Sequence, residues 1–239
     1  MLGDFMLGPA IPSFLEAYPD VSLDLSLRDH LIDPIAEGVD VVVRMAELRE
    51  SELVSKRLGG VRLVVAGAPS YFARRGRPRE VVDLEKHACI GYLSGGTAMP
   101  WRFGGRTGPV SVTSVGRLHV NCGQTLRQAA RAGLGLIQVF EYFVAEDLRS
   151  GALELVLCDH EPEPRPIYAL YPHHKHAVPK VRVFLDFLAS VFRSGPAGDG
   201  KVAGPAGVAG GAGKQDGRSG PGSRGRSSAR GRSSRVRTA

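Results

Sequence analysis

Short segments with the apolar spacing of a helix alternate along most of this chain with segments spaced like strands. In AIPSFLEAYP (residues 10–19) the apolar residues follow the i, i+3, i+4, i+7 pattern of a helix with one buried face, and Pro19 ends it. In DVSLDLSLRD (20–29) apolar and polar residues alternate, as in a strand with one covered face. This alternation predicts an α/β fold with mainly parallel sheets, whose ligands bind at the carboxyl ends of the strands.

The same patterns continue to residue 193. They predict helices at 29–38, 70–76, 80–86, 125–132, 141–151 and 178–193. They predict strands at 39–45, 61–69, 88–92, 110–115, 116–121, 133–140, 152–157 and 165–172. The continuous apolar run at 39–45 is typical of a buried strand in a parallel sheet. The last helix is expected to bury one side, formed by Val181, Phe184, Leu185, Leu188 and Phe192.

The excess of positive charge lies in residues 195–239. The chain has a formal net charge of +7, but this tail holds nine Lys or Arg and two Asp or Glu, which leaves 22 of each sign in residues 1–194. The part before the tail therefore lacks the basic excess of a nucleic-acid groove. The tail is rich in Gly, Ser, Ala and Arg, and we expect it to be disordered because it buries too little surface to offset chain entropy. Its arginines could hold RNA or DNA weakly, but a spacer is the favoured interpretation.

Composition sets further limits on the class of protein. With 43% apolar residues, 239 residues suffice for one large domain or two modest ones. No run of about 18 apolar residues occurs and the start lacks a secretory signal pattern, so we expect a cytoplasmic protein. Three widely spaced cysteines, at 89, 122 and 158, predict neither a disulfide framework nor a thiolate zinc site.

The segment NCGQTLRQAARAGLGLIQVF (121–140) has two functional interpretations. Cys122 could be a thiol nucleophile, because a helix start lowers thiol pKa values and His119 lies upstream. Strand spacing does not place His119 against Cys122, so a small buried side chain is favoured. In the second interpretation, the amides of the helix start form a polar concavity for a carboxylate or another small anion, together with Asn121, Gln124 and Thr125. Plain helix capping by Thr125 or Asn121 is an equally supported alternative.

Two other features have structural explanations. The histidines of HHKH (173–176) and His160 lack metal-site spacing on an evident helix or strand with a carboxylate partner, so we expect a solvated loop and predict no metal. The single tryptophan, Trp101, is expected to pack in the core or at a hinge rather than to form a stacking platform. The sequence predicts no cofactor and no enzymatic step.

Several phrases, in their order along the chain, resemble one known family. They are PAIPSFLEAYPDVSLDLSLRDHLIDPIAEGVDVVVRM, LVSKRLGGVRLVVAGAPSYFARRGRPREVVDLEKHACIGY, WRF, NCGQTLRQAARAGLGLIQVFEYFVAEDLRSGALELVL and YALYPHHKHAVPKVRVFLDFL. Residues 3–193 thereby resemble the effector-binding region of LysR-type transcriptional regulators. The resemblance implies two Rossmann-like lobes joined by two crossover strands, as in type 2 periplasmic binding proteins, with a small-molecule inducer in the cleft.

The resemblance also implies lobe boundaries and site residues. Lobe one is expected to comprise residues 1–64 and 165–194, and lobe two residues 65–164. The cleft is expected to be lined by Arg44, Met45, Ser94, Gly95, Asn121, Cys122, Gln124, Thr125, Gln138 and Phe140. In this interpretation Cys122 is a wall residue and takes no catalytic part.

The sequence departs from the family pattern at both ends. The winged helix-turn-helix and linker helix that bind DNA and dimerise do not precede Met1, so we expect no specific binding of operator DNA by the chain as given. The strand that normally precedes DFMLGPAIPSF is also missing, which is expected to leave neighbouring strand edges unpaired. The basic tail has no counterpart in the family.

Taken with the resemblance, the residues predict an N-terminally truncated effector-sensing domain that acts by ligand-biased closure of its lobes and so changes oligomer geometry. The expected partners are a small organic effector, with an anion favoured, and further copies of the chain in the full-length family; no membrane partner is expected. A stand-alone solute-binding protein with no link to transcription is the alternative that the fold allows. A thiol enzyme using Cys122 is a third hypothesis.

Overall fold

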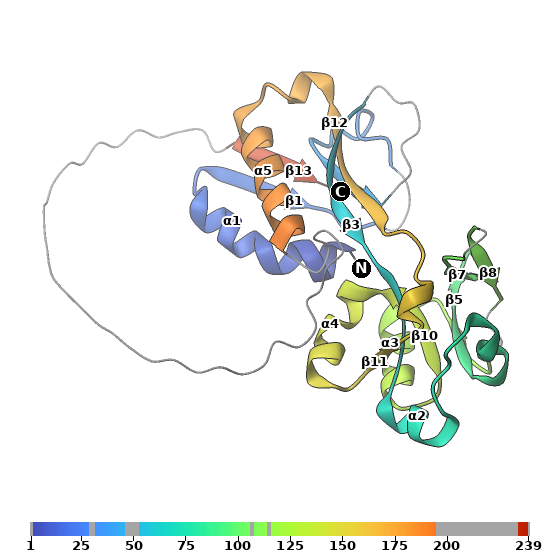
Figure 1. Cartoon of the computed structure of the whole chain (residues 1–239). Helices are drawn as coiled ribbons and strands as arrows, with labels where there is room; N and C mark the ends of the chain where they lie inside the picture. The colour runs from blue at the N-terminus through green and yellow to red at the C-terminus, as the bar shows by residue number, and fades with distance from the viewer. Residues whose placement is uncertain are drawn as a thin grey trace, which may run out of the picture.

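The computed structural model describes residues 2–28, 32–45, 53–105, 108–113, 116–194 and 234–238. Two lobes are joined by two long strands that run between them in opposite directions (Figure 1). These crossover strands are β3 (Leu53–Val61) and β12 (Arg165–Pro172). Two Rossmann-like lobes with two crossovers are the predicted architecture, and the prediction of this fold class is confirmed. The predicted lobe boundaries remain a prediction, and below each lobe is defined by its sheet.

The first lobe contains a sheet in the order β2-β12-β3, with β2 (Val42–Met45) at one edge. Helices α1 (Ile11–Ala17) and α5 (Pro179–Ser194) lie beside each other in this lobe (Figure 1). The Phe14 ring of α1 packs against Phe184 and Phe187 of α5, with ring centroids 5.2 and 4.8 Å apart. The predicted buried side of the last helix is confirmed, since all five of its residues are at most 2% exposed.

Strand β1 (Val21–Leu25) forms a separate two-stranded parallel pair with β13 (Ser234–Thr238). The register runs from Val21 opposite Ser234 to Leu25 opposite Thr238. The expectation of a wholly disordered tail is therefore wrong for residues 234–238, and β1 does have a paired edge. In this strand the backbone groups of the five residues pair with those of β1, and composition alone does not predict such pairing. The rest of the predicted tail disorder concerns residues outside the described part of the chain.

The second lobe is built on a six-stranded sheet in the order β11-β4-β10-β5-β6, with β9 pairing to β5. These strands are β4 (Leu63–Gly67), β5 (Cys89–Ser94), β6 (Thr97–Ala98), β9 (His119–Val120), β10 (Leu136–Phe140) and β11 (Glu154–Val156). The helices of the lobe are α2 (Pro69–Arg75), α3 (Gly123–Arg131) and α4 (Glu141–Ser150). A small separate hairpin is formed by β7 (Trp101–Phe103) and β8 (Val110–Val112).

The sheets are mixed, so the prediction of mainly parallel sheets is wrong. β10 runs parallel to β5 but antiparallel to β4, and β11 is also antiparallel to β4. In the first lobe β12 is antiparallel to both β2 and β3, which corrects the parallel pairing predicted for 39–45. In the first lobe the physical reason is the pair of crossovers: the chain leaves through β3 and returns through β12, so these two strands run in opposite directions within one sheet.

Short helices complete the fold. They are η1 (Gly3–Leu7), η2 (Gly8–Ala10), η3 (Val81–Lys86), η4 (Cys158–His160) and η5 (His173–Lys175). The first of them, η1, contacts α5 of the first lobe and α4 of the second. Its Phe5 ring meets the edge of Phe143 with centroids 4.9 Å apart, and Met6 and Leu7 are buried. One hydrophobic cluster therefore extends from the first lobe through η1 into the second.

Two predicted helices differ in detail. The described part of 29–38 forms a turn rather than a helix, because the Asp33 carboxylate accepts hydrogen bonds from the amides of Ile35 and Ala36 and so competes with helical pairing. The predicted helix 125–132 begins two residues earlier, at Gly123, and neither Asn121 nor Thr125 caps it; Cys122 stands at the N-cap position. Gly133 ends this helix in the left-handed conformation with φ 73°, as predicted.

Candidate functional site

A cavity of about 290 Å³ lies in the second lobe where the parallel strands β5 and β10 end. The first turns of α3 and α4, the residues before and within β7, and the beginnings of β4 and β12 close it. The lining residues are Leu63, Tyr92, Ser94, Met99, Pro100, Trp101, Arg102, Gly123, Leu126, Gln138, Val139, Phe140, Tyr142, Phe143 and Arg165. The carboxyl end of parallel strands is where ligands bind in such sheets, so the position agrees with the prediction from the α/β pattern.

The walls of the cavity are mostly aromatic and apolar. Trp101 is 4% exposed and Phe143 is 2% exposed, so both rings are fixed by surrounding core residues. The rings of Phe140 and Tyr142 are stacked, with centroids 5.9 Å apart and an angle of 5° between their planes. Trp101 packs in the core, as expected, and it also contributes to the cavity wall.

The Gln138 side chain forms two hydrogen bonds to the backbone of Arg102. The Arg102 amide donates to Gln138 Oε1 at 2.8 Å, and Gln138 Nε2 donates to the Arg102 carbonyl at 2.7 Å. This paired contact attaches β7 to β10, since β7 and β10 belong to different sheets. By binding both the amide and the carbonyl of Arg102, Gln138 holds the backbone of β7 in place. It thereby positions Trp101 and Arg102 at the cavity.

Arg62, in the link between β3 and β4, connects the segment that leads into β12 to the start of α4. Its Nε and Nη2 each donate to the Glu161 carboxylate at 2.8 Å, and its Nη1 donates to Glu141 Oε1 at 3.0 Å. Arg62 lies between β3 and β4, Glu161 precedes β12 and Glu141 is the first residue of α4. The hydrogen bonds to Glu161 raise the pKa of Arg62, whereas burial raises the pKa of Glu141 despite the nearby guanidinium. For Glu141 burial outweighs pairing, because its Oε2 is buried without a hydrogen-bond partner among the described residues.

The structure brings only part of the predicted site together. Ser94, Gln138 and Phe140 line the cavity. Asn121, Cys122, Gln124 and Thr125 are exposed around the start of α3, whose Gly123 and Leu126 form the wall instead. Gly95 lies in the turn after β5 with φ 57°, and Arg44 and Met45 end β2 in the first lobe. A contact of these seven residues with an effector remains a prediction.

Cys122 has the electrostatics of a helix start. The backbone amide of Thr125, then its hydroxyl and the amide of Gln124, lower the pKa of the Cys122 thiol. The side chain is exposed, so the expectation of a small buried residue is wrong. Cys89, in contrast, is buried, and burial raises its pKa to about 11.

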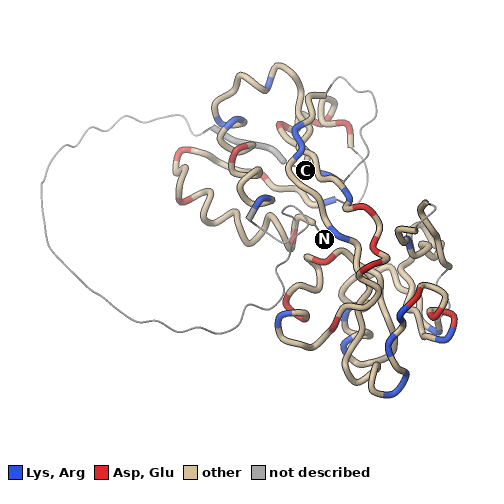
Figure 2. Tube along the Cα trace, viewed as in Figure 1, with Lys and Arg blue, Asp and Glu red and all other residues tan. Residues whose placement is uncertain are grey.

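The remaining predicted features lie away from the cavity. His173 and His174 are exposed on η5, and the His176 ring stacks on Tyr171 with centroids 5.8 Å apart. Within the described ranges no group of three or more His, Cys, Asp or Glu side chains could hold a metal ion. The same part of the chain contains no helix with the length and apolar character needed to cross a membrane. Figure 2 shows acidic and basic residues mixed over both lobes.

Most of the cavity wall was not predicted. The missed wall includes Trp101, Leu126, Tyr142, Phe143 and Arg165. A signal for Tyr142 and Phe143 exists in the sequence, because they follow the buried strand 133–140 directly and so lie at its carboxyl end. No local signal marks Arg165, which reaches the cavity only because the return crossover passes beside it.

Comparison with known proteins gives a consistent family match. The model of the LysR substrate binding domain matches residues 1–193. The chain is 32% identical over 190 residues to YhjC of Escherichia coli, an HTH-type transcriptional regulator, with 79% of this chain and 64% of YhjC covered. It is also 32% identical over 182 residues to the HTH-type transcriptional activator AaeR of E. coli, with 74% of this chain and 58% of AaeR covered.

A solved structure with the same fold is the regulatory domain of CrgA, a LysR-type transcriptional regulator from Neisseria meningitidis. It is 28% identical, with a TM-score of 0.69, and the match covers 79% of this chain and 93% of that domain. The chain spans only 58 to 64% of the length of the two E. coli regulators. The similarity thus concerns a part of each of these two regulators.

Proposed function

Because the chain belongs to the LysR substrate-binding domain family, we propose that the cavity of the second lobe holds the small-molecule effector of a transcriptional regulator. The observation that carries this proposal is the position of the cavity. It lies at the carboxyl ends of β5 and β10. It also touches Arg165, the first residue of the crossover β12, and Leu63, which begins β4 two residues after the crossover β3 ends. A ligand there would contact the crossover β12 directly and would lie next to the strand that follows β3.

The mechanism follows from that contact. A ligand shifts a two-state equilibrium only by binding one state more tightly than the other. A rotation of the lobes about β3 and β12 would change the surroundings of Leu63 and Arg165, so a ligand that touches them would favour one lobe arrangement. The Phe5–Phe143 contact offers a second link, because Phe143 lines the cavity while Phe5 belongs to η1 between the lobes. In a homo-oligomer the selected arrangement would then change the spacing of helix-turn-helix modules on operator DNA.

The alternatives have less support. A solute-binding protein unconnected with transcription would share the fold, but the relatives that match are HTH-type regulators. The matched relatives are regulators, which does not favour a thiol enzyme that uses Cys122. In addition, Cys122 does not line the cavity.

Native mass spectrometry would test the proposal. The protein is incubated with the low-mass fraction of its source cells, and a stoichiometric small-molecule adduct is expected. Ser94→Phe should abolish the adduct because the new ring occupies the cavity. Thr97→Phe is the matched control, since Thr97 pairs with Ser94 in the β5–β6 hairpin but does not line the cavity. No adduct, or an adduct that survives Ser94→Phe, would contradict the proposal.

A further inference from the structure

Arg62 is shared unequally between two carboxylates. Its Nε and Nη2 donate to the two oxygens of Glu161, each at 2.8 Å, so Glu161 is held by a full fork of two hydrogen bonds. Glu141 receives one bond, from Nη1 to Oε1 at 3.0 Å, and its Oε2 is buried without a partner among the described residues. The side chains of Arg62, Glu161 and Glu141 are 20, 15 and 8% exposed, so water screens the attraction between them weakly.

The unpartnered oxygen of Glu141 makes a second arrangement of these groups accessible. A buried carboxylate oxygen without a hydrogen bond raises the free energy of the charged form, and burial accordingly raises the pKa of Glu141. Nη1 and Nη2 form a second fork at the end of the guanidinium. A turn of the guanidinium towards α4 would place this fork on both oxygens of Glu141 and would leave Glu161 with a single bond. Small shifts of α4 therefore decide which carboxylate takes the full fork.

Glu141 belongs to the wall side of this arrangement. It is the first residue of α4 and stands between Phe140 and Tyr142, which both line the cavity. Its backbone amide donates to the Arg62 carbonyl at 3.0 Å, so the start of α4 and the link between β3 and β4 are also joined through their backbones. A displacement of the cavity wall at α4 would thus reach Arg62 directly.

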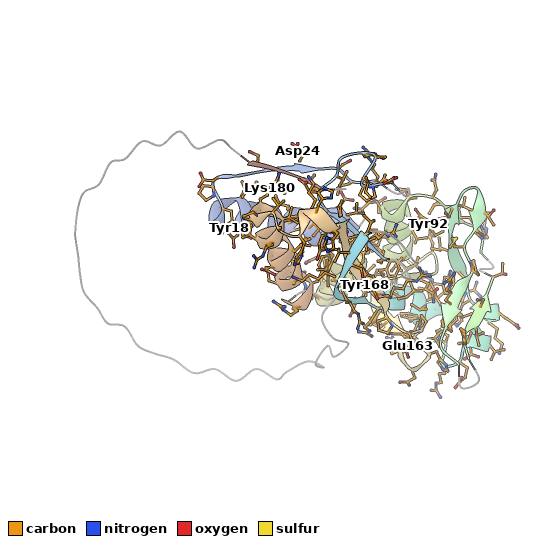
Figure 3. All side chains as sticks on the ribbon, turned by 90° about the horizontal axis from the view of Figure 1, so that it is seen from above. Tyr18, Asp24, Tyr92, Glu163, Tyr168 and Lys180 are labelled. Carbon is orange, nitrogen blue, oxygen red and sulfur yellow. The ribbon has the colours of Figure 1, made fainter. Side chains whose placement is uncertain are left out.

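Glu161 belongs to the crossover side. It lies in the segment that leads into β12, in which Figure 3 labels Glu163. At this end the two crossovers pair with each other, with Arg165 of β12 opposite Val61 of β3, the residue before Arg62. Loss of the full fork on Glu161 would therefore loosen the second-lobe end of the crossovers.

We propose that Arg62 is a positioning residue that couples the cavity to the crossovers by transferring its full fork from Glu161 to Glu141. This inference rests on the proposed function and adds the route by which the same cavity acts on the lobes. Leu63 and Tyr142 line the cavity and are the chain neighbours of Arg62 and Glu141. A ligand that draws Leu63 and Tyr142 together brings the guanidinium to Glu141 and releases the segment before β12.

Isosteric variants test the fork transfer without any ligand, with hydrogen–deuterium exchange as the measurement. Glu161→Gln weakens the fork on Glu161, so amide exchange in residues 161–167 should become about tenfold faster. The guanidinium then binds Glu141 fully, so exchange in residues 141–147 should become slower in the same variant. Glu141→Gln removes the competing carboxylate and should leave exchange in 161–167 unchanged or slower. A purely structural ion pair would instead be loosened by either substitution.

Two further variants serve as controls, with the fold followed by circular dichroism. Arg62→Lys keeps the charge but lacks the fork, so adding Glu161→Gln to it should no longer slow exchange in 141–147. Lys56→Gln removes a different charge pair of β3, with Asp186 of α5 at 2.9 Å, and should leave both segments unchanged. The proposal is overturned if Glu161→Gln speeds exchange in both segments, if Glu141→Gln speeds it in 161–167, or if the slowing persists with Arg62→Lys.

The low-mass fraction of the source cells tests the link to the cavity. In the native chain it should speed exchange in 161–167, and in Glu141→Gln it should not, although native mass spectrometry still detects the adduct. An adduct that leaves exchange in the native chain unchanged, or an equal response in Glu141→Gln, overturns the proposal. Absence of any adduct refutes the proposed function, and the comparison without ligand still decides whether Arg62 transfers its fork.

Discussion

At the scale of single residues, Glu141 shows how burial and pairing compete in one carboxyl group. Arg62 donates to its Oε1, but Oε2 is buried without a partner among the described residues, and the side chain is 8% exposed. Burial therefore raises its pKa above the ordinary value of 4.5. A carboxyl group whose pKa is higher in the folded state than in the unfolded state binds protons more readily when folded, so its contribution to stability falls as pH rises.

Glu141→Gln should weaken this pH dependence. In the native chain the contribution is fully present below pH 4.5 and is lost as pH rises through the raised pKa of Glu141. The glutamine cannot ionise, and its oxygen can still accept from Arg62, so the urea midpoint of the variant should change less over this window. Glu163→Gln, at an exposed position shortly before β12, serves as control. An unchanged profile in Glu141→Gln would contradict the account.

Of the residues predicted to line the site, those on β5 and β10 line the cavity and the others stand outside its lining, and contact of any of them with an effector stays a prediction. Ser94 and Phe140 end β5 and β10, whereas Gln138 lies in the middle of β10, and all three line the cavity. Trp101 was interpreted as a core residue, and it is one, but its second role depends on the hydrogen bonds between Gln138 and Arg102. These contacts join segments 36 residues apart, so no local pattern encodes them.

At the scale of elements, α3 and α4 both begin at the cavity and are joined behind it by Asp147. This carboxylate is 2% exposed; Arg127 binds both of its oxygens, and Arg131 lies 3.6 Å from Oδ1. The hydrogen bond from Arg127 Nη2 measures 2.9 Å. The cluster fixes the orientation of the two helices whose first turns carry Leu126, Tyr142 and Phe143 into the cavity wall.

Asp147→Asn should therefore destabilise the protein by about 3 kcal/mol, because it removes the charge that compensates the partly buried Arg127. Chemical denaturation measures the difference in unfolding free energy. The dependence of this free energy on denaturant concentration should be the same in both proteins. The neighbouring Glu146→Gln provides the control: its pair with Arg149 is exposed and should contribute about 0.5 kcal/mol or less. Equal effects of the two substitutions would show that Asp147 does not connect α3 and α4 as described.

The predicted helices agree with the structure where no other interaction competes with the local apolar pattern. The apolar stripe of α5 is long and regular, and its five expected core residues are all buried. The segment 29–38 has a weaker pattern, and Asp33 beside Pro34 provides a turn that competes with the helix. The start of α3 was predicted two residues late, because Thr125 and Asn121 are good capping residues that the structure does not use.

At the scale of the whole molecule, sheet topology was the least predictable feature. Alternating helices and strands indicated parallel pairing, but the two crossovers place antiparallel strands in both lobes. Figure 3 labels Tyr168 on β12, which pairs with Arg44 of β2 in the first lobe, and Tyr92 on β5 of the second lobe. The pairing of β13 with β1 joins residues more than 200 positions apart and has no local signal.

Deletion of residues 234–239 should expose the paired edge of β1. Hydrogen–deuterium exchange at Val21–Leu25 should become faster, since β13 is the strand partner of β1 in the described structure. The change in overall unfolding free energy should be small, about 1 kcal/mol, because each lost hydrogen bond is worth about 1 kcal/mol net while ordering the tail costs a similar amount per residue. A six-residue deletion within 201–214 keeps β13 and should leave exchange at β1 unchanged. Equal exchange in both deletions would refute the pairing.

The central claim is that the cavity between β5, β10, α3 and α4 holds a small-molecule effector in contact with Arg165 of the crossover β12 and with Leu63, which follows the crossover β3. A crystal structure of the protein after incubation with the low-mass fraction of its source cells tests this most directly. The account predicts continuous ligand density against Trp101 and Phe140, within reach of Leu63 and Arg165, together with a changed angle between the lobes. Ligand density at another place, with only water in this cavity, would contradict it.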